Sequence, residues 1–221
     1  MNYTQFKHKY QHLPIIWSKD IIDLLPAKQN VKSPDRQIIL NQLYRWQEQG
    51  LIVKLKRGIY LLNENDRKIQ PSRSFIANQL YMPSYVSLEY ALNFYGLIPE
   101  KVADVTSVTT KKTTRFSAQK GTFIYQHVKP GAFRGFKTFK DEAGLTFFMA
   151  LPEKAIVDFI YLNLEKFKAA DPEIFEQSYR FQNLEDLDKK LIMEFTALYD
   201  SPKLIRVLQS FCAFMCRETK S

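Results

Sequence analysis

The side chains best suited to chemistry in this sequence are amides and cations that could bind nucleic acid. Gln37 and Asn41 carry amides that can pair with adenine, and Arg45 can pair with guanine. The short run Lys54–Arg57 adds three cations of the kind that contact phosphates. The predicted DNA-binding surface consists of Arg36, Gln37, Asn41, Tyr44, Arg45, Lys54, Lys56 and Arg57.

A helix must position the first of these groups. Ser33 and Pro34 are typical of a helix start, and Gly50 is typical of the residue after a helix. Ile39, Leu43 and Trp46 recur at helical spacing and predict the buried face. The amides and Arg45 then lie on the opposite or flanking face, where they could reach base edges.

A hairpin must position the second group. Leu51–Leu55 and Ile59–Leu62 are short β-rich runs around Gly58. Two shorter helices are expected earlier, over 2–10 and, after a Ser18 cap, over 19–25. Three helices followed by a basic hairpin predict a winged helix-turn-helix. The alternative is a small three-helix module with a solvated polar face.

The rest of the chain predicts a second, larger domain. The polar segment Asn63–Pro71 is the expected linker, which gives a winged-helix domain over 1–66 and an α+β domain over 71–221. Helices are expected over 72–81, 87–96 and 151–163, and strands over 105–109, 113–118, 122–128, 136–140 and 145–149. The hairpin signals predict an antiparallel sheet. The remainder to Cys216 is expected to be helical, with breaks near 171–172 and 200–202.

Charge is unevenly distributed along the chain, whose formal net charge is +9. The segments 1–70 and 101–140 are basic, at +6 and +8, whereas 141–200 is acidic, at −7. Basic segments favour nucleic-acid partners. The candidate basic face of the larger domain consists of Lys111, Lys112, Arg115 and Lys120. With Phe116, Phe123 and Tyr125 it could form a stacking platform for single strands, although aromatics in a sheet core are the simpler interpretation.

The usual catalytic signatures are missing from the sequence, which contains no GxGxxG, phosphate-binding loop, GxSxG elbow or HExxH. His127 falls in a strand pattern, and Glu185, Asp186 and Asp188 fit a solvated helix face better than a metal site. Cys212 and Cys216 are expected to be core cysteines. We therefore expect no enzyme activity, catalytic residue, metal or cofactor.

No targeting or membrane segment is expected. No apolar run approaches the roughly 18 residues that cross a bilayer, and the polar N-terminus does not resemble a signal peptide. The sequence thus predicts a cytoplasmic protein with no membrane partner.

An ordered set of short motifs resembles the AbiEi-type antitoxin family. No single motif is specific, but they follow the family's order over roughly residues 33–162. The motifs are Gly50-Leu51-Ile52, Arg57-Gly58-Ile59-Tyr60, Pro83–Leu92, Tyr95–Glu100, Val105–Thr110, Gly121–Tyr125 and Ala150–Ala155.

The resemblance implies the antitoxin of a type IV toxin–antitoxin system, linked to abortive phage infection. In that family a winged helix represses its own operon, and the C-terminal domain counters a nucleotidyltransferase-like toxin without necessarily binding it. The alternative is a stand-alone regulator whose C-terminal domain senses a ligand or dimerises. A third alternative is an enzyme that modifies the toxin. The sequence contains no nucleotide-binding loop that would support it.

Overall fold

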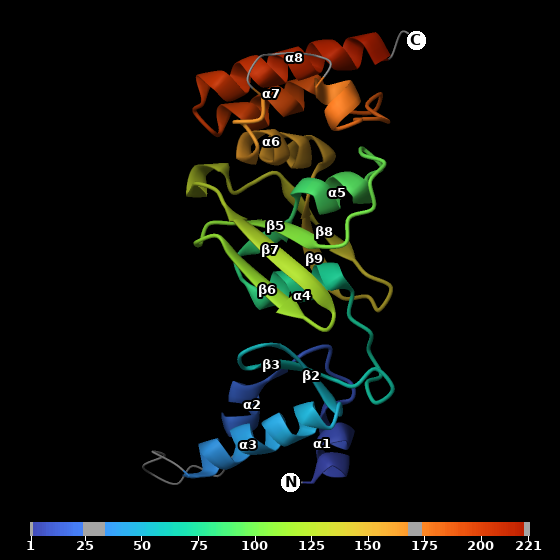
Figure 1. The fold of residues 1–221 in the computed structure, drawn as a ribbon, viewed down its shortest axis with the longest axis vertical. Helices are drawn as coiled ribbons and strands as arrows, with labels where there is room; N and C mark the ends of the chain where they lie inside the picture. The colour runs from blue at the N-terminus through green and yellow to red at the C-terminus, as the bar shows by residue number, and fades with distance from the viewer. Residues whose placement is uncertain (1, 24–33, 168–173, 219–221) are drawn as a thin grey trace.

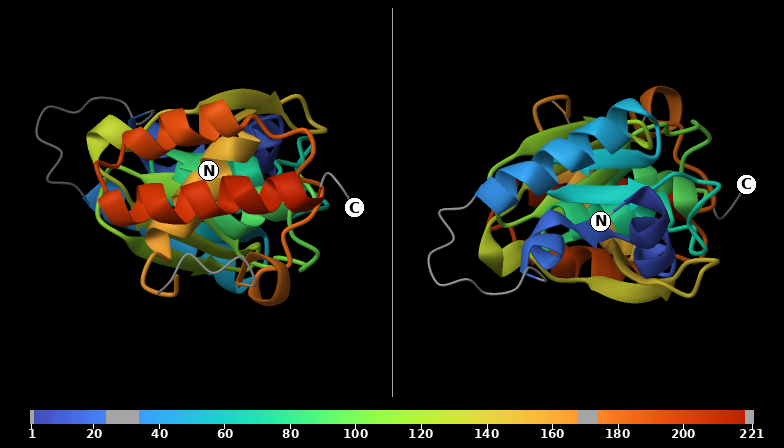
Figure 2. Two further views of the ribbon diagram at one scale, coloured as in Figure 1. Left: turned by 90° about the horizontal axis from the view of Figure 1, so that it is seen from above. Right: turned by 90° about the horizontal axis from the view of Figure 1, so that it is seen from below.

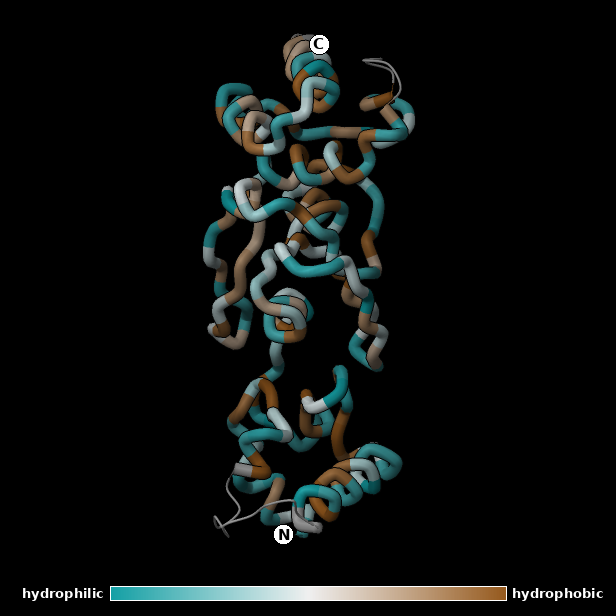
Figure 3. The backbone as a smooth tube through the Cα atoms, turned by 90° about the vertical axis from the view of Figure 1, so that its left-hand side faces the viewer, coloured by the Kyte–Doolittle hydropathy of each residue, from teal (hydrophilic) through white to brown (hydrophobic). Residues whose placement is uncertain are grey.

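The computed structural model describes residues 2–23, 34–167 and 174–218. The fold is mixed α+β with two sheets. Figure 1 shows an elongated molecule in which a small N-terminal module lies at one end, a larger sheet lies in the middle and a helical layer lies at the other end. Figure 3 shows hydrophilic backbone where the chain passes from the module to the larger unit.

The described residues of the N-terminal module form three helices and a small antiparallel sheet of order β1-β3-β2. Its elements are α1 (Tyr3–Tyr10), β1 (Ile16–Trp17), α2 (Ser18–Asp23), α3 (Pro34–Glu48), β2 (Ile52–Lys56) and β3 (Ile59–Leu62). The predicted helices and hairpin are confirmed, except that the expected end of the second helix lies outside the described residues. Strand β1 was not predicted, because two residues are too few to show alternation.

The larger unit is built on a six-stranded sheet of order β6-β7-β5-β4-β9-β8. Its strands are β4 (Ser84–Val86), β5 (Val105–Thr109), β6 (Thr114–Ala118), β7 (Gly121–His127), β8 (Phe136–Lys140) and β9 (Thr146–Ala150). The prediction of an antiparallel sheet is only partly right. The pairs β4–β5, β6–β7 and β8–β9 are antiparallel, but β5 pairs with β7 and β4 pairs with β9 in parallel, so the sheet is mixed. Turn signals in the sequence predict only how strands that follow one another in the chain pair. Here β6 folds onto the outer side of β7, so β7 lies beside β5 and runs in the same direction.

Helices cover both faces of this sheet. Helix α4 (Arg73–Leu80) lies on the face turned toward the N-terminal module, and α5 (Leu88–Phe94) and α6 (Pro152–Leu162) lie on the opposite face. Helices α7 (Lys189–Ala197) and α8 (Pro202–Glu218) form the outer layer, seen from above in Figure 2. Two short elements complete the list, a 3₁₀ turn over Pro130–Ala132 and a π-helical turn over Ile174–Ser178.

The helical prediction for the C-terminal part is only partly right. The break at 200–202 is confirmed, and the one at 171–172 lies outside the described residues. Residues 179–188 form no regular helix. Arg180 and Asn183 have positive φ, and the Asn183 amide donates to the Gly96 carbonyl. Bonds to another part of the chain therefore replace helical bonds here.

The described residues include no helix that is long and apolar enough to cross a membrane.

Candidate nucleic-acid interface

The exposed face of α3 carries the predicted base-reading side chains. Gln37, Asn41, Tyr44 and Arg45 are all exposed, as is the flanking Arg36. Gln37 Nε2 donates to Asn41 Oδ1 at 2.8 Å, so two amides one turn apart form a pair. Figure 2, seen from below, shows α3 running across the end of the molecule that lies farthest from α8.

The opposite face of α3 fixes the helix in place. Leu43 and Trp46 are buried, at 1% and 5% exposure, and half-buried Ile39 packs beside them. The Trp46 ring lies 4.7 Å from the Phe6 ring of α1, between centroids. Gly50 ends the helix with a φ of +69°, a conformation that glycine adopts without strain. The predicted apolar stripe is therefore confirmed, and the amide row projects from a firmly packed helix.

The hairpin divides its three cations between two surfaces. Lys54 and Arg57 are exposed. Lys56 instead points to the larger unit, where its ammonium donates to the Leu80 carbonyl and lies 5.1 Å from the centre of the Phe116 ring. Burial, followed by the charge of Lys111, lowers the pKa of Lys56. Because Lys56 is directed to the larger unit, it is left out of the phosphate contacts proposed below.

An irregularity in β2 explains the different direction of Lys56. Lys54 pairs with Tyr60, but Lys56 pairs with Ile59, so the register shifts between them. Such a bulge re-aims the side chains that follow it. In the sequence the three cations look equivalent. Only the pairing of β2 with β3 shows that Lys56 points in a different direction from Lys54 and Arg57.

The basic residues of the larger domain do not form one free face. Arg115 lies 3.6 Å from the Asp104 carboxylate, and Lys120 lies 3.1 Å from Glu64 of the linker. The bond from Lys120 is the main cause that lowers the pKa of Glu64. Lys111 and Lys112 are exposed in the loop before β6, where the Lys111 ammonium lies 5.4 Å from the Tyr81 ring centre.

The aromatic side chains near these cations are mainly core residues. Phe123 and Tyr125 are fully buried, and the Tyr125 hydroxyl donates to the Ala77 carbonyl at 2.6 Å. Phe116 is half-buried against Tyr81. The single-strand platform is therefore wrong for Phe123 and Tyr125, whose rings no base could reach.

The predicted linker is folded onto the N-terminal module. Arg67 is 6% exposed, and its guanidinium donates to the Leu62 carbonyl at 3.1 Å. Asp66 accepts bonds from Lys7, at 2.5 Å, and from the Tyr3 hydroxyl, at 2.7 Å. These bonds anchor the segment and fix the direction in which the chain leaves the module.

A buried polar network, which the sequence analysis missed, joins α6 to its neighbours. Asp158 accepts bonds from Tyr85 and Ser87, both at 2.9 Å, and also from Lys154 and Tyr199. Lys154 and Asp158 are 0% exposed. Desolvation lowers the pKa of Lys154, and the Asp158 charge opposes that change.

The sequence did contain a signal for this network. Lys154 and Asp158 stand four apart in the otherwise apolar helix PEKAIVDFIYL, where an opposite-charge pair can form on one face. The complete burial of both charges keeps substrates away from them. We therefore interpret the network as a structural link between α6, β4 and the turn that follows α7.

The other candidate groups lie apart. His127 is exposed on β7, and Asp188 caps α7 by accepting from the Lys190 amide at 2.8 Å. Glu185 and Asp186 are exposed but lie outside any helix. Cys212 is half-buried, whereas Cys216 is exposed, so the prediction of two core cysteines is wrong for Cys216. Among the described residues no three metal-binding side chains form a group.

Comparison with protein-family models gave no match, and comparison with curated proteins gave none either.

Proposed function

We propose that this protein binds double-stranded DNA through a winged helix-turn-helix formed by residues 1–66. The observation that carries the proposal is the exposed row of Gln37, Asn41 and Arg45 on a helix whose other face is buried. Amide and guanidinium groups on such a row suit adenine and guanine edges in the major groove. Lys54 and Arg57 on the hairpin suit the adjacent phosphates.

The proposed biological role is that of an antitoxin in a type IV toxin–antitoxin system. Support comes from the ordered motifs between residues 33 and 162 and from the division into a small basic module and a larger unit. In this proposal the module represses the protein's own operon. The larger unit opposes a nucleotidyltransferase-like toxin, and direct contact between the two proteins is not required.

A second candidate is a stand-alone regulator whose larger unit senses a ligand. One observation favours it, an apolar hollow beside α4 that is lined by Asn78, Ser84 and Phe148 among others. Neither candidate assigns a reaction to the chain, and both place the protein in the cytoplasm.

Two experiments test the antitoxin role. A nucleotidyltransferase reading frame beside this gene, toxic when expressed alone and harmless with this protein, is the result expected. A control co-expression uses a chain with Asn41→Ala and Arg45→Ala, which should lose promoter repression yet still protect. If the adjacent frame encodes no toxin, or if this protein gives no rescue, the antitoxin role is wrong and the regulator remains.

A further inference from the structure

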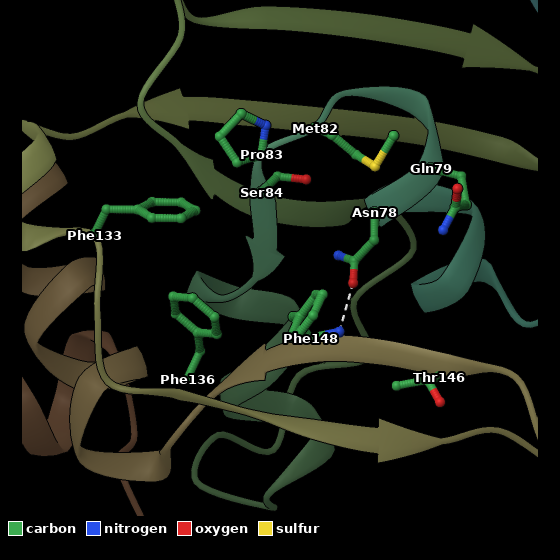
Figure 4. A pocket seen from close by; sticks show the side chains of 9 residues that line it. All are labelled: Asn78, Gln79, Met82, Pro83, Ser84, Phe133, Phe136, Thr146 and Phe148. Carbon is green, nitrogen blue, oxygen red and sulfur yellow. Dashed lines mark hydrogen bonds between the residues drawn. The ribbon is translucent and has the colours of Figure 1, made fainter.

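A hollow of about 260 Å³ lies on the sheet face that α4 covers only in part. It opens between the end of α4 and strands β4, β8 and β9 (Figure 4). Most of its wall is apolar, from Met82, Pro83, Phe133, Phe136 and Phe148. The volume is slightly below the roughly 300–1,000 Å³ of sites for drug-sized ligands, which fits a molecule of one or two rings.

Two buried polar side chains point into this hollow. Asn78 and Ser84 are 4% and 6% exposed, and Figure 4 shows the amide nitrogen and the hydroxyl directed toward its interior. Neither Asn78 Nδ2 nor Ser84 Oγ has a hydrogen-bond partner within the described part of the chain. A buried polar atom without a partner loses its hydration without a compensating hydrogen bond, so a ligand that satisfies both atoms would be bound more tightly.

A hydrogen bond fixes the orientation of the Asn78 amide. Asn78 Oδ1 accepts from the Phe148 backbone N–H of β9, which leaves Nδ2 to face the hollow. The site therefore presents a fixed donor, while the Ser84 hydroxyl can donate or accept. The matching ligand group is a carbonyl oxygen or a ring nitrogen.

The other side chains that line the hollow indicate that the ligand is aromatic and uncharged. The Phe136 ring lies 5.7 Å from the Phe148 ring and nearly perpendicular to it, an arrangement that favours a third aromatic ring. None of the described lining residues carries a charge. At the mouth, Met82 and Phe148 are 51% and 42% exposed, and the flexible methionine can move to admit a ring.

We propose that this hollow binds a neutral aromatic or heteroaromatic molecule of one or two rings that carries a hydrogen-bond acceptor. Asn78 Nδ2 donates to the acceptor, Ser84 completes the polar contact, and the phenylalanines enclose the ring. This inference does not depend on the antitoxin role or on DNA binding.

The test measures binding of 2-quinolone to the full chain by ligand-observed NMR and by isothermal titration calorimetry. Naphthalene provides the same ring shape without an acceptor, and quinoline-2-carboxylate adds a charge. We expect saturable binding of 2-quinolone, which is tighter than that of either analogue. Ser84→Ala should weaken 2-quinolone binding about 3- to 10-fold, the value of one hydrogen bond, and leave naphthalene binding unchanged.

Ser107 provides a matched control. Its hydroxyl is also fully buried and also lacks a partner among the residues described, but it lies on β5 and does not line the hollow. Ser107→Ala should leave 2-quinolone binding unchanged. The proposal is overturned by failure of 2-quinolone to bind, by naphthalene binding as tightly, or by equal effects of the two serine substitutions. Urea unfolding of each variant shows that it is folded.

Discussion

Individual buried charges illustrate how polar groups are accommodated inside this protein. Asp158 uses one carboxylate to satisfy two tyrosines, a serine and a lysine, all of them buried. A buried ion pair contributes little beyond a good apolar replacement, but loss of one partner leaves an uncompensated charge. The main effect of the network is therefore to determine how α6 packs against β4 and against the segment that follows α7.

Asp158→Asn should be strongly destabilising, because it leaves the buried Lys154 ammonium without a carboxylate. We expect a loss of about 3–5 kcal/mol in the free energy of unfolding, measured by urea denaturation. The matched control is Lys190→Ala. Lys190 and Glu194 have the same four-residue spacing at 4.0 Å but are exposed, so the control should cost less than about 0.5 kcal/mol. Equal costs for the two variants would contradict the assignment of Asp158 as the centre of the network.

Asp66 should make folding stability depend on pH on the acid side. Hydrogen bonds from Lys7 and then Tyr3 lower its pKa below the ordinary value of 3.8. The unfolded chain therefore binds the proton more readily, and the stabilisation is complete above the ordinary pKa and is lost as pH falls through the folded one. The wild type should exceed Asp66→Asn in stability at about pH 6, with the gap closing toward about pH 2.

The measurement for Asp66 is thermal unfolding of both proteins across this pH range. Lys7→Met removes the stronger of the two hydrogen-bond donors to Asp66. In that background, Asp66→Asn should therefore cause a smaller loss of stability at about pH 6. A constant difference between wild type and Asp66→Asn at every pH would show that the carboxylate charge does not stabilise the fold.

At the scale of elements, the proposed DNA binding gives α3 and the hairpin separate roles on one duplex. The helix presents amides, which distinguish bases, and the hairpin presents cations, which do not. The shift in register within β2 assigns Lys56 to the contact with α4 and β6. The two tasks can therefore be tested independently.

Lys54→Ala combined with Arg57→Ala should weaken binding to all DNA sequences equally. Each lost phosphate contact lowers the slope of log affinity against log salt by about 0.9, so the pair should lower it by about 2. The measurement is fluorescence anisotropy over a range of salt concentrations. Lys56→Ala is the internal control and should leave the slope unchanged. A slope reduced by Lys56→Ala would mean that the ammonium leaves Leu80 and reaches DNA.

Asn41→Ala should reduce sequence specificity. Loss of an amide pair to adenine costs roughly 1–3 kcal/mol on the operator and little on random DNA. Competition between operator and random duplexes measures the difference. Asn65→Ala, an exposed asparagine in the linker turn, should have no effect on either DNA. A loss of affinity that is the same for both duplexes would assign Asn41 to the DNA backbone.

At the scale of the whole molecule, the two units are less independent than the sequence suggests. The module has its own core around Phe6, Leu43 and Trp46, but Leu55, Ile59 and Leu61 of its hairpin belong to the core of the larger unit. Strand β6 lies beside β2, and Lys120 reaches Glu64. Separation of the units would expose apolar surface on the hairpin.

From the proposed antitoxin role, we expect residues 71–221 to fold alone and to protect cells from the toxin without repressing the promoter. Residues 1–70 should bind the operator weakly and give no protection. Both fragments should be less stable than the full chain, because separation removes the apolar contact between the hairpin and the larger unit. Growth beside the toxin and a promoter reporter measure both activities. Protection by 1–70, or its absence with a folded 71–221, would overturn the division of roles.

The sequence by itself determined most local structure, because caps, glycines and apolar spacing act over a few residues. It placed α3, its buried stripe and the β2–β3 hairpin, and it placed five of the six strands in the larger sheet. It also identified the exposed amides on α3, since a side chain opposite an apolar stripe must face outward.

Only the tertiary structure decided what depends on distant partners. Parallel pairing of β5 with β7, the inward turn of Lys56 and the Asp158 network each join residues far apart in the chain. The hollow at Asn78 and Ser84 is likewise lined by residues that are far apart in the chain, such as Asn78, Phe136 and Phe148. The sequence shows which side chains are polar. Only the tertiary structure determines which of them form hydrogen bonds within the protein and which, like Asn78 Nδ2 and Ser84 Oγ, do not do so among the described residues.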